Sequence, residues 1–352
     1  MPASRASTDL PPLVPPVCYA WQSFAQSWQV WKTLNMKLPT QLDPVYFDEI
    51  YRLRPELWRD AIRQVCLAHQ ISAEAMTEFS DGSNLVAAVG RQTIVKIFPP
   101  FHRHQWESER RVLRHLGRRI AVPIPLLIAE GEREDYWTYL ILSRLPGVTL
   151  EVVWPECSRV EKASLLHKIG SMMADVHSVP FDELITLDPE WKAFLAQQVN
   201  RAAARHERLG MPKWFHGALD TFVQENLGRL PGDARPVVLT GEYTPFNLLV
   251  EGPVGALRFS GMIDFGDAMV GLREYDFLGP IMFLAAGDAS LVQSLLQGYG
   301  YTHGQIGSQL RRKLMLLQIL HRYSNFSAQL KIPDWQKKVN SIEELEELIW
   351  PL

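Results

Sequence analysis

The sequence changes character once, at Leu145-Pro146-Gly147, and that change limits the folds open to the chain. Before it, short runs rich in β-branched and aromatic residues alternate with turn residues, and one amphipathic helix is expected at 106–116. The predicted strands are 75–79, 84–89, 93–98, 125–130 and 137–143. After the change, long helical patterns dominate, with a β-rich island at 236–263. This order predicts an α+β chain with a small β-rich lobe followed by a larger helical lobe.

Length and composition fit this outline. A chain of 352 residues is long enough for two domains, or for one domain with two lobes. The formal net charge of −3 gives no reason to expect a nucleic-acid partner or a polybasic membrane anchor. No apolar run approaches the roughly 20 residues that a membrane span needs. The odd count of three cysteines, without a C-x-x-C pair, indicates reduced thiols and a cytoplasmic location.

The bounds of the lobes follow from the same patterns. The first 16 residues contain five prolines and no continuous apolar stretch, so they do not resemble a signal peptide. Residues 1–40 are predicted to form a disordered leader, and we hypothesise that translation starts at Met36. One or two amphipathic helices, interrupted at a proline, are expected at 43–72. We therefore place the small lobe with its helical preface at 41–144 and the large lobe at 145–352.

The segment from Thr240 to Asp276 carries the strongest chemical pattern in the chain. Glu242 and Asn247 stand five residues apart in a loop between two predicted strands, and Asp264-Phe265-Gly266 ends a later strand. Phosphoryl transfer uses a carboxylate beside the attacking hydroxyl, together with an amide oxygen and a second carboxylate that hold Mg²⁺. Each of these residue types is common in turns when taken alone. The ordered set favours a phosphoryl-transfer site.

This segment resembles the catalytic segment of the aminoglycoside phosphotransferase and choline kinase superfamily, whose members share the protein-kinase-like fold. That family shows H-G-D-x-x-x-x-N, then I-D-F-G-D-A, then G-x-x-x-Y-D. The resemblance implies a bilobal kinase-like fold, with Glu242 as the catalytic residue and with Asn247 and Asp264 as the Mg²⁺ ligands. It also implies that Asp276 is a buried acid that braces the catalytic loop.

The chain departs from the family pattern at two positions. Thr240 stands where the family has His, and Glu242 stands where it has the catalytic Asp. The carboxylate of Glu reaches about 1.5 Å further than that of Asp, and a misplacement of about 1 Å can reduce a rate roughly a hundredfold. The departure predicts an altered substrate or weak activity, unless the backbone has shifted to compensate.

The small lobe supplies candidates for nucleotide binding. Lys96 lies inside an apolar β run, where an unpaired ammonium is unfavourable. Glu109, which begins the pattern E-x-x-x-L-x-x-L, is the natural partner, with Glu107 as the competing choice because only one of the two can face Lys96. The alternative is a surface lysine on an edge strand. The resemblance implies that a paired Lys96 binds the α- and β-phosphates of ATP.

Two further segments are candidates for nucleotide contacts. Asp81-Gly82-Ser83-Asn84 occupies the first hairpin, where backbone N–H groups meet phosphate in kinase-like proteins; taken alone, it is an ordinary β-turn. The stretch from Leu142 through Ser143 to Leu145 resembles the hinge between the lobes, whose backbone pairs with the adenine edge. His177 is expected to pack structurally rather than to act in catalysis.

The identity of the acceptor is the least determined feature. A site for a polycationic aminoglycoside should be lined by acids, whereas the helical insert at 181–230 offers a group of basic residues, which is compatible with a neutral or anionic hydroxylated metabolite: Lys192, Arg201, Arg205, His206 and Arg208. An acidic cluster before Trp350 is interpreted as a solvated helix face: Glu343, Glu344, Glu346 and Glu347. The sequence predicts an ATP- and Mg²⁺-dependent phosphotransferase acting on a hydroxyl of an aminoglycoside-like or other hydroxylated metabolite. The alternative is a pseudokinase-like nucleotide-binding module in which Glu242 has abolished or weakened activity.

Overall fold

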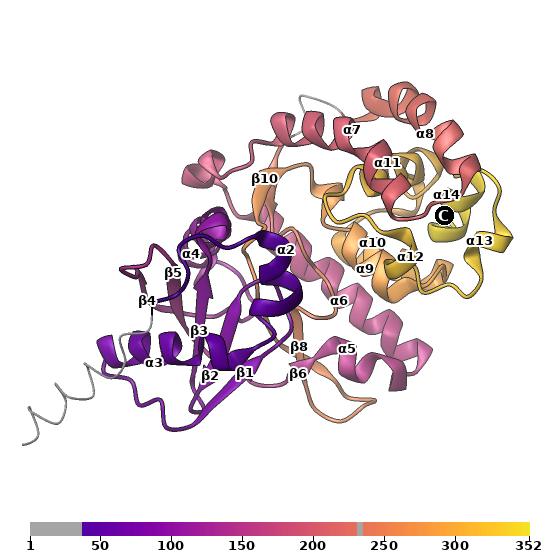
Figure 1. Ribbon diagram of the computed structural model, residues 1–352. Coiled ribbons are helices and arrows are strands. Elements are labelled where there is room, and N and C mark those ends of the chain that lie inside the picture. Colours follow the sequence, from indigo (N-terminus) through magenta and orange to yellow (C-terminus); the bar gives the residue numbers. More distant parts are fainter. Residues whose placement is uncertain (1–36, 231–234) are drawn as a thin grey trace, which may run out of the picture.

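The computed structural model describes residues 37–230 and 235–352, which form a small lobe and a larger helical lobe (Figure 1). Most of the predicted leader, with Met36 and the first cysteine, lies outside the described residues. Its last residues belong to the small lobe: Leu38 is buried and donates its backbone N–H to Asp135 at 2.8 Å, and Pro39 accepts a hydrogen bond from the Trp137 indole. Leu38 and Pro39, which were predicted to belong to the leader, are therefore part of the small lobe.

The small lobe is built on one antiparallel sheet with the strand order β1-β2-β3-β5-β4. Its strands are β1 (Met76–Phe79), β2 (Leu85–Val89), β3 (Thr93–Phe98), β4 (Leu127–Glu132) and β5 (Thr138–Ser143). All five were predicted, and their alternation assigns each side chain to one face. Leu140 and Leu142 pack toward α4 (Arg103–Leu116), whereas Ile141 packs toward α3 (Arg59–Ala68) on the opposite face.

The helical preface covers the α3 face of this sheet. It consists of α2 (Pro44–Tyr46), the π-helix η1 (Phe47–Tyr51), the 3₁₀ helix η2 (Pro55–Leu57) and α3. The predicted interruption falls at Pro55, because the residue before a proline is sterically pushed out of the helical region. Trp58 is completely buried at the start of α3, and its indole N–H bonds the Arg52 carbonyl at 3.1 Å. The preface is thus an integral layer of the small lobe.

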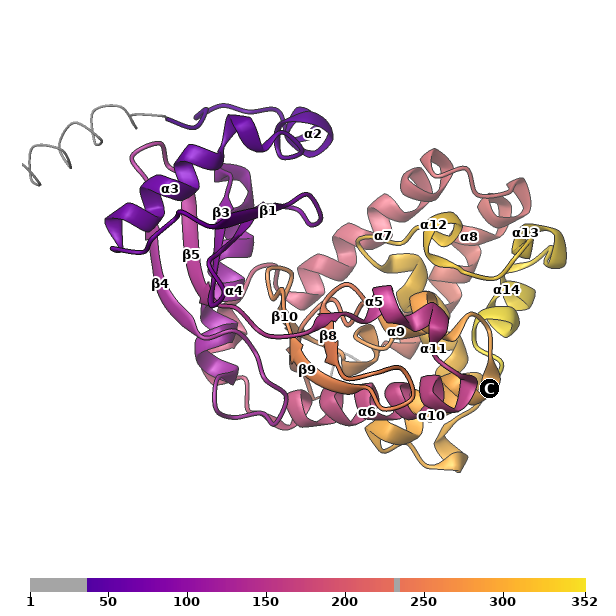
Figure 2. The same ribbon diagram turned by 90° about the horizontal axis from the view of Figure 1, so that it is seen from below.

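The large lobe is mostly helical, and Figure 2 shows it beside the sheet of the small lobe. Its longer helices are α6 (Arg159–Ser178), α7 (Trp191–Arg208), α8 (Lys213–Asn226), α10 (Ala289–Tyr299), α11 (Ser308–Leu320) and α14 (Ile342–Ile349). Shorter ones are α5 (Leu150–Val153), α9 (Leu278–Pro280), the π-helix η8 (Ile281–Ala285), α12 (Phe326–Gln329) and α13 (Trp335–Lys338). Within the described ranges, no helix is long and apolar enough to cross a bilayer.

The predicted β-rich island is divided between two sheets. β8 (Leu248–Glu251) pairs with β9 (Arg258–Met262) and with β6 (Val148–Thr149), whereas β7 (Val237–Leu239) pairs with β10 (Met269–Gly271). The sequence predicted neither β6 nor β10, because runs of two and three residues carry no readable alternation. Two loops, β7–β8 and β9–β10, therefore connect the same pair of sheets and lie side by side.

The C-terminal segment closes the large lobe rather than lying in solvent. Trp335 and Trp350 are both buried. Glu346 in α14 is also buried and pairs with Arg311 and Arg312 of α11, at 3.1 and 2.7 Å. The solvated-face interpretation is thus wrong for Glu346, because α14 turns this carboxylate onto a basic face of α11.

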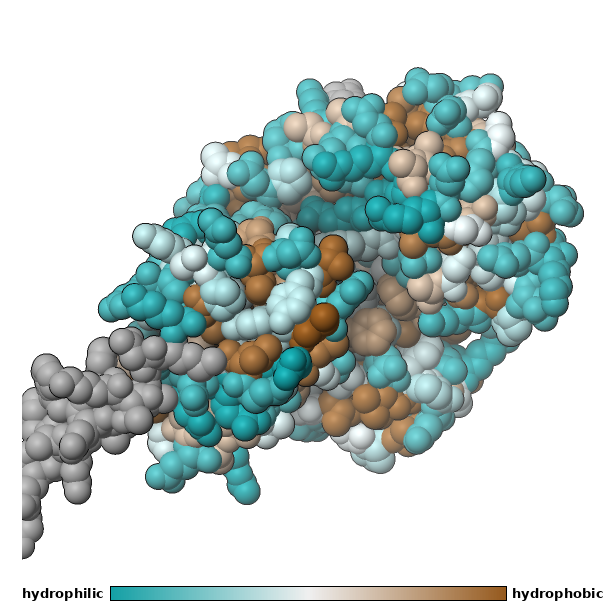
Figure 3. All heavy atoms as spheres, in the orientation of Figure 1, coloured by the Kyte–Doolittle hydropathy of each residue, from teal (hydrophilic) through white to brown (hydrophobic). Residues whose placement is uncertain are grey.

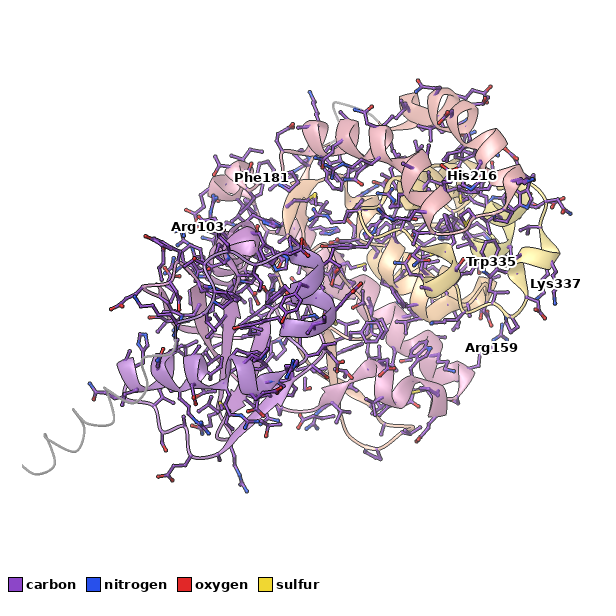
Figure 4. The ribbon with its side chains drawn as sticks, in the orientation of Figure 1. Arg103, Arg159, Phe181, His216, Trp335 and Lys337 are labelled. Atoms are coloured by element: carbon purple, nitrogen blue, oxygen red, sulfur yellow. The ribbon has the colours of Figure 1, made fainter. Side chains whose placement is uncertain are left out.

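Contacts outside the hinge also connect the lobes. The segment that follows α6 runs back along α4, and Phe181 lies close to the small lobe in Figure 4. His115 contacts the Pro180 carbonyl at 2.6 Å, and Arg111 bonds Thr186 at 2.7 Å. This segment fixes α4, and hence Glu109, relative to the large lobe.

Candidate active site

A buried ion network joins the small lobe to the large lobe. Lys96 Nζ lies 2.7 Å from a Glu109 oxygen and 2.9 Å from Asp264 Oδ1. Lys96 is only 6% exposed, because β3 directs it toward α4, on the same face as Phe98. Burial alone lowers the pKa of the ammonium, but the charges of Asp264 and Glu109 outweigh it and raise the pKa above its ordinary value.

The structure decides which glutamate faces Lys96. Glu107 instead forms an ion pair with Arg110 at 2.7 Å on the outer side of α4. Two positions along a helix differ by about 200° in direction, so Glu107 cannot reach the sheet while Glu109 does. The predicted pair is therefore Lys96 with Glu109, and a surface lysine on an edge strand is excluded because β3 lies between β2 and β5.

The loop between β7 and β8 is held from behind by Asp276. Its carboxylate accepts the backbone N–H groups of Thr240 and Gly241, both at 3.1 Å, and contacts His177 Nε2 at 3.1 Å. Gly241 adopts a φ of +84°, and a Cβ there would lie 2.7 Å from the Asp267 carbonyl oxygen. Glycine is thus required where the loop passes the β9–β10 loop. Asp276 and His177 act on the site through the loop backbone and do not line it themselves.

Glu242 and Asn247 face each other across this loop. Asn247 Nδ2 donates to Glu242 Oε2 at 3.2 Å and to the Glu242 carbonyl at 3.3 Å. Burial, followed by the nearby carboxylates of Asp267 and Asp264, raises the pKa of Glu242 to about 8. The Glu242 side chain, which is longer than the Asp of the family pattern, thus lies beside Asn247 and near Asp264, the two other residues of the predicted pattern.

Asp264 is placed beside Asn247 by the ladder that continues from β8 and β9. The Ile263 N–H donates to the Asn247 carbonyl at 3.0 Å, so the next residue emerges next to the loop. Asp264 itself has a φ of +65°, and its Oδ1 accepts the Gly266 N–H at 3.3 Å, while Phe265 is fully buried. The anchored Phe265 and this turn direct the Asp264 carboxylate into the space between the lobes.

The donor set fits Mg²⁺ better than a transition metal. Asn247 and Asp264 offer an amide oxygen and a carboxylate, since the Asn247 nitrogen is already bonded to Glu242. Mg²⁺ prefers oxygen ligands and commonly takes only one or two carboxylates, with water and phosphate oxygens completing its shell. In the described part of the chain, no group of three or more His, Cys, Asp and Glu side chains could hold a metal ion.

Only some residues of the turn predicted to cover the nucleotide phosphates are available to a ligand. Gly82 has a φ of +94° and makes the turn between β1 and β2. Asn84, however, is buried: it bonds Gln105 at 2.9 Å and contacts His102 at 3.1 Å. Its side chain therefore supports the turn from inside and is not available to a phosphate, because both ends of its amide are already bonded to Gln105 and His102. Ser83 lies at the edge, with a longer bond of 3.3 Å to Gln105.

The hinge residues predicted to contact the base also differ in how free they are to bind a ligand. The N–H of Ser143 bonds the Leu126 carbonyl at 2.9 Å, and the N–H of Arg144 bonds the Gln92 carbonyl at 2.7 Å. Leu142 is buried within the sheet, where it pairs with Ile94 and Leu127. Both N–H groups before Leu145 are thus committed to the protein, which leaves Leu145 as the hinge candidate best suited to a ligand.

Two residues of the site were missed by sequence reasoning. Arg322 and Tyr323 follow α11 and bond the two oxygens of Asp267, each at 2.9 Å. Asp267 belongs to the D-F-G-D-A motif and was a readable signal. Its partners, more than fifty residues away, lie in no local pattern.

Comparison with known proteins agrees with this geometry. A model of the phosphotransferase enzyme family matches residues 76–314. The GDP complex of wild-type aminoglycoside 2′-phosphotransferase-IIIa is similar in fold, with a TM-score of 0.61 and 17% identity, over 82% of this chain and 98% of that one. The streptomycin–ATP ternary complex of APH(2″)-IIa has a TM-score of 0.53 and 18% identity, over 80% and 97%.

A third structure, aminoglycoside-3′-phosphotransferase of type VIII, has a TM-score of 0.55 and 19% identity, over 74% of this chain and 97% of that one. No curated protein sequence matches the chain. The solved structures confirm the predicted kinase-like bilobal fold. The family match runs from the first strand of the small lobe into α11, and so includes both Lys96 and the loops that carry Glu242 and Asp264. The chain therefore belongs to the phosphotransferase enzyme family.

Proposed function

We propose that this phosphotransferase moves the γ-phosphate of ATP, with Mg²⁺, to a hydroxyl group of a small metabolite. The observation that carries the proposal is the convergence of two pairs: Lys96 and Asp264 lie 2.9 Å apart, and the charge of Asp264 acts on Glu242, which contacts Asn247 at 3.2 Å. Ammonium, amide and two carboxylates are the groups that phosphoryl transfer uses.

The nucleotide is bound mainly by the small lobe. Lys96, held by Glu109, binds the α- and β-phosphates, and the backbone of the turn at Gly82 and Ser83 covers them. The backbone of Leu145 pairs with the edge of the base. Asn247 Oδ1 and the Asp264 carboxylate hold Mg²⁺, which when bound screens the negative charge of the phosphates.

Glu242 receives the proton of the acceptor. As the acceptor oxygen forms its bond to the γ-phosphorus, the bond from that phosphorus to the β-phosphate oxygen breaks, and the hydroxyl proton passes to the Glu242 carboxylate. Only the ionised form of Glu242 can accept this proton; with the pKa raised to about 8, that form is a stronger base than an ordinary glutamate, and its population grows as the pH rises toward 8. Asp276 is a positioning residue, because it holds the N–H groups of Thr240 and Gly241.

The inactive-module alternative is less well supported. A module that only binds nucleotide has little need of both Asn247 and Asp264. Glu242 is also bonded within the loop rather than turned into solvent. A carboxylate in this position favours turnover.

The test combines thermal shift with turnover. In the wild type we expect ATP to raise the melting temperature more with Mg²⁺ than without it, and we expect Asp264→Ala to abolish that difference. Glu242→Gln should keep Mg²⁺-dependent binding but lose roughly 10²- to 10⁴-fold in turnover against a panel of hydroxylated metabolites and antibiotics. The exposed residues of α8 provide matched controls, Asp220→Ala and Glu225→Gln, which should leave both measurements unchanged.

Two results would decide against the proposal. Mg²⁺-dependent ATP binding that survives Asp264→Ala contradicts the site. Metal-dependent binding with no turnover of any acceptor, unaffected by Glu242→Asp, is the result expected of a pseudokinase-like module.

A further inference from the structure

A cavity of about 670 Å³ lies where α7, the start of α4 and the turn after α11 meet. It is separate from the residues proposed to bind the nucleotide. The side chains that give it its character are His104, Arg201, Arg205, Arg208, Arg322 and Tyr323. Among the described residues that line it, none is Asp or Glu. Figure 3 shows the hollow between the lobes, with hydrophilic side chains gathered over α7 and along its margin.

Three of these arginines come from one face of α7. Arg201, Arg205 and Arg208 are spaced by four and three residues, which aligns their side chains on successive helical turns. Arg205 and Arg208 lie in the last turn of α7, where cations interact favourably with the helix dipole, but like charges at these spacings also repel one another. The three arginines therefore make this face of α7 strongly cationic where it borders the cavity.

The charge of this face is not compensated within the protein. Arg205 donates to the Gln198 side chain at 2.7 Å and to the Ile319 carbonyl at 2.8 Å, both neutral acceptors, and its Nε is buried with no hydrogen-bond partner. Arg201 and Arg208 are exposed, and no carboxylate of the described chain pairs with either. Burial, followed by the charges of Arg208 and Arg201, lowers the pKa of Arg205. By contrast, Arg322 is neutralised by Asp267 at 2.9 Å.

Arg322 and Tyr323 connect this cavity to the surroundings of the proposed catalytic carboxylate. Arg322 and Tyr323 line it and also bond Asp267, whose charge contributes to the raised pKa of Glu242. Neither Glu242 nor Asp267 lines the cavity itself. An acceptor that contacts α7 must therefore extend past Arg322 and Tyr323 for its hydroxyl group to reach Glu242.

We propose that the acceptor carries a negatively charged group, a phosphate or a carboxylate, which Arg201, Arg205 and Arg208 bind while its hydroxyl faces Glu242. The inference rests on the proposed function and specifies its substrate class. A guanidinium presents two parallel N–H donors that match the oxygens of a carboxylate or phosphate. An uncompensated cationic face repels a polycation, so an aminoglycoside is disfavoured as acceptor.

The test measures how affinity depends on charge in a series with one hexose skeleton. Dissociation constants are determined for glucose 6-phosphate, glucuronate, glucose and glucosamine with the full chain, in the presence of Mg²⁺ and a non-hydrolysable ATP analogue that fills the nucleotide site. We expect glucose 6-phosphate, glucuronate or both to bind at least tenfold more tightly than glucose, and glucosamine to bind no more tightly than glucose. A preference for one of the two anions identifies the charged group as phosphate or carboxylate.

The variants assign this preference to α7. In the double variant Arg201→Gln/Arg208→Gln, the tenfold advantage of the anions should disappear, and both positions are exposed, so the fold should be retained. Lys192→Gln, an exposed charge of the same helix that does not line the cavity, is the matched control and should keep the advantage. Charge reversal at the same two positions, Arg201→Glu/Arg208→Glu, should make glucosamine the tightest ligand.

The outcomes separate this inference from the proposed function. Affinities that do not depend on charge, tighter binding of glucosamine by the wild type, or an anion advantage that survives Arg201→Gln/Arg208→Gln would each overturn the inference. A chain that does not bind the ATP analogue with Mg²⁺ would contradict the proposed function instead. The sugar titrations are therefore repeated without nucleotide, so that they report on the cavity in either case.

Discussion

The crossing of α6 and α10 offers the sharpest test of how packing supports the active site. The two helices meet at Gly170 and Gly298 without any side chain between them. A Cβ at position 298 would lie 2.7 Å from the His167 carbonyl carbon, and nearer still to its oxygen. Heavy atoms in contact are about 3.5–4.0 Å apart, so Gly298→Ala requires the helices to separate by roughly 1 Å.

The expected loss of stability follows from two opposing effects. Forcing a methyl group against rigid backbone costs about 1–3 kcal/mol. Alanine is a better helix former than glycine by up to about 1 kcal/mol, which offsets part of that cost. We therefore expect Gly298→Ala to lower the free energy of unfolding by roughly 1–2 kcal/mol.

The same substitution should reduce turnover. α6 carries His177, whose ring contacts Asp276, and Asp276 holds the backbone N–H groups at the start of the Glu242 loop. A displacement of about 1 Å in a catalytic group can reduce a rate around a hundredfold. We expect kcat to fall at least tenfold, while ATP binding through Lys96 in the small lobe changes little.

Thermal denaturation and steady-state kinetics measure both effects. Gly217→Ala in α8 is the matched control, since a Cβ there meets nothing within 4 Å. It should be neutral or stabilising by up to about 1 kcal/mol, with kcat unchanged. A Gly298→Ala protein that melts at or above the wild-type temperature would refute the packing argument.

Three further predictions concern buried charges. Glu109→Gln should weaken ATP binding and lower the free energy of unfolding, measured by urea denaturation, by about 1–3 kcal/mol. The loss should be smaller than for a fully isolated buried charge, because Asp264 stays 2.9 Å from Lys96. An unchanged denaturation midpoint would contradict the buried ion network. Burial lowers the pKa of His206 to about 4, so the unfolded chain binds more protons at this site between that value and about 6.5. His206 should therefore contribute a fall in stability of about 1.4 kcal/mol per pH unit as the pH drops through this range, and His321, whose pKa burial also lowers, acts in the same direction. His206→Gln should make the measured slope less steep by about that amount, and an equally steep wild-type and variant profile would exclude a contribution from His206. Glu346→Gln should lower the free energy of unfolding by about 1–3 kcal/mol in the same urea assay, because it breaks buried ion pairs with α11. Glu347→Gln, at the exposed neighbouring position, should change it by less than about 1 kcal/mol. Equal effects of the two substitutions would argue against the buried pairs.

The sequence by itself determined the features that are local. The strands of the small lobe could be predicted because alternation and turn residues lie within a few positions of one another. The Glu242, Asn247 and Asp264 pattern was readable for a similar reason, since its spacing is fixed by a loop and a hairpin. The change at Leu145-Pro146-Gly147 was readable because it follows directly on the last strand of the small-lobe sheet, β5, which ends at Ser143.

Only the tertiary structure decided the features that depend on distant segments. The orientation of α4 makes Glu109, rather than Glu107, the partner of Lys96. The pairing of β7 with β10 likewise joins segments that are far apart in the sequence and could not be predicted from it. The basic cavity joins α7 to residues after α11, more than a hundred positions away. A periodic pattern reports which side of an element is buried, but not which element covers it. That partner is chosen by packing across the whole chain, and it is what gives this phosphotransferase its candidate acceptor site.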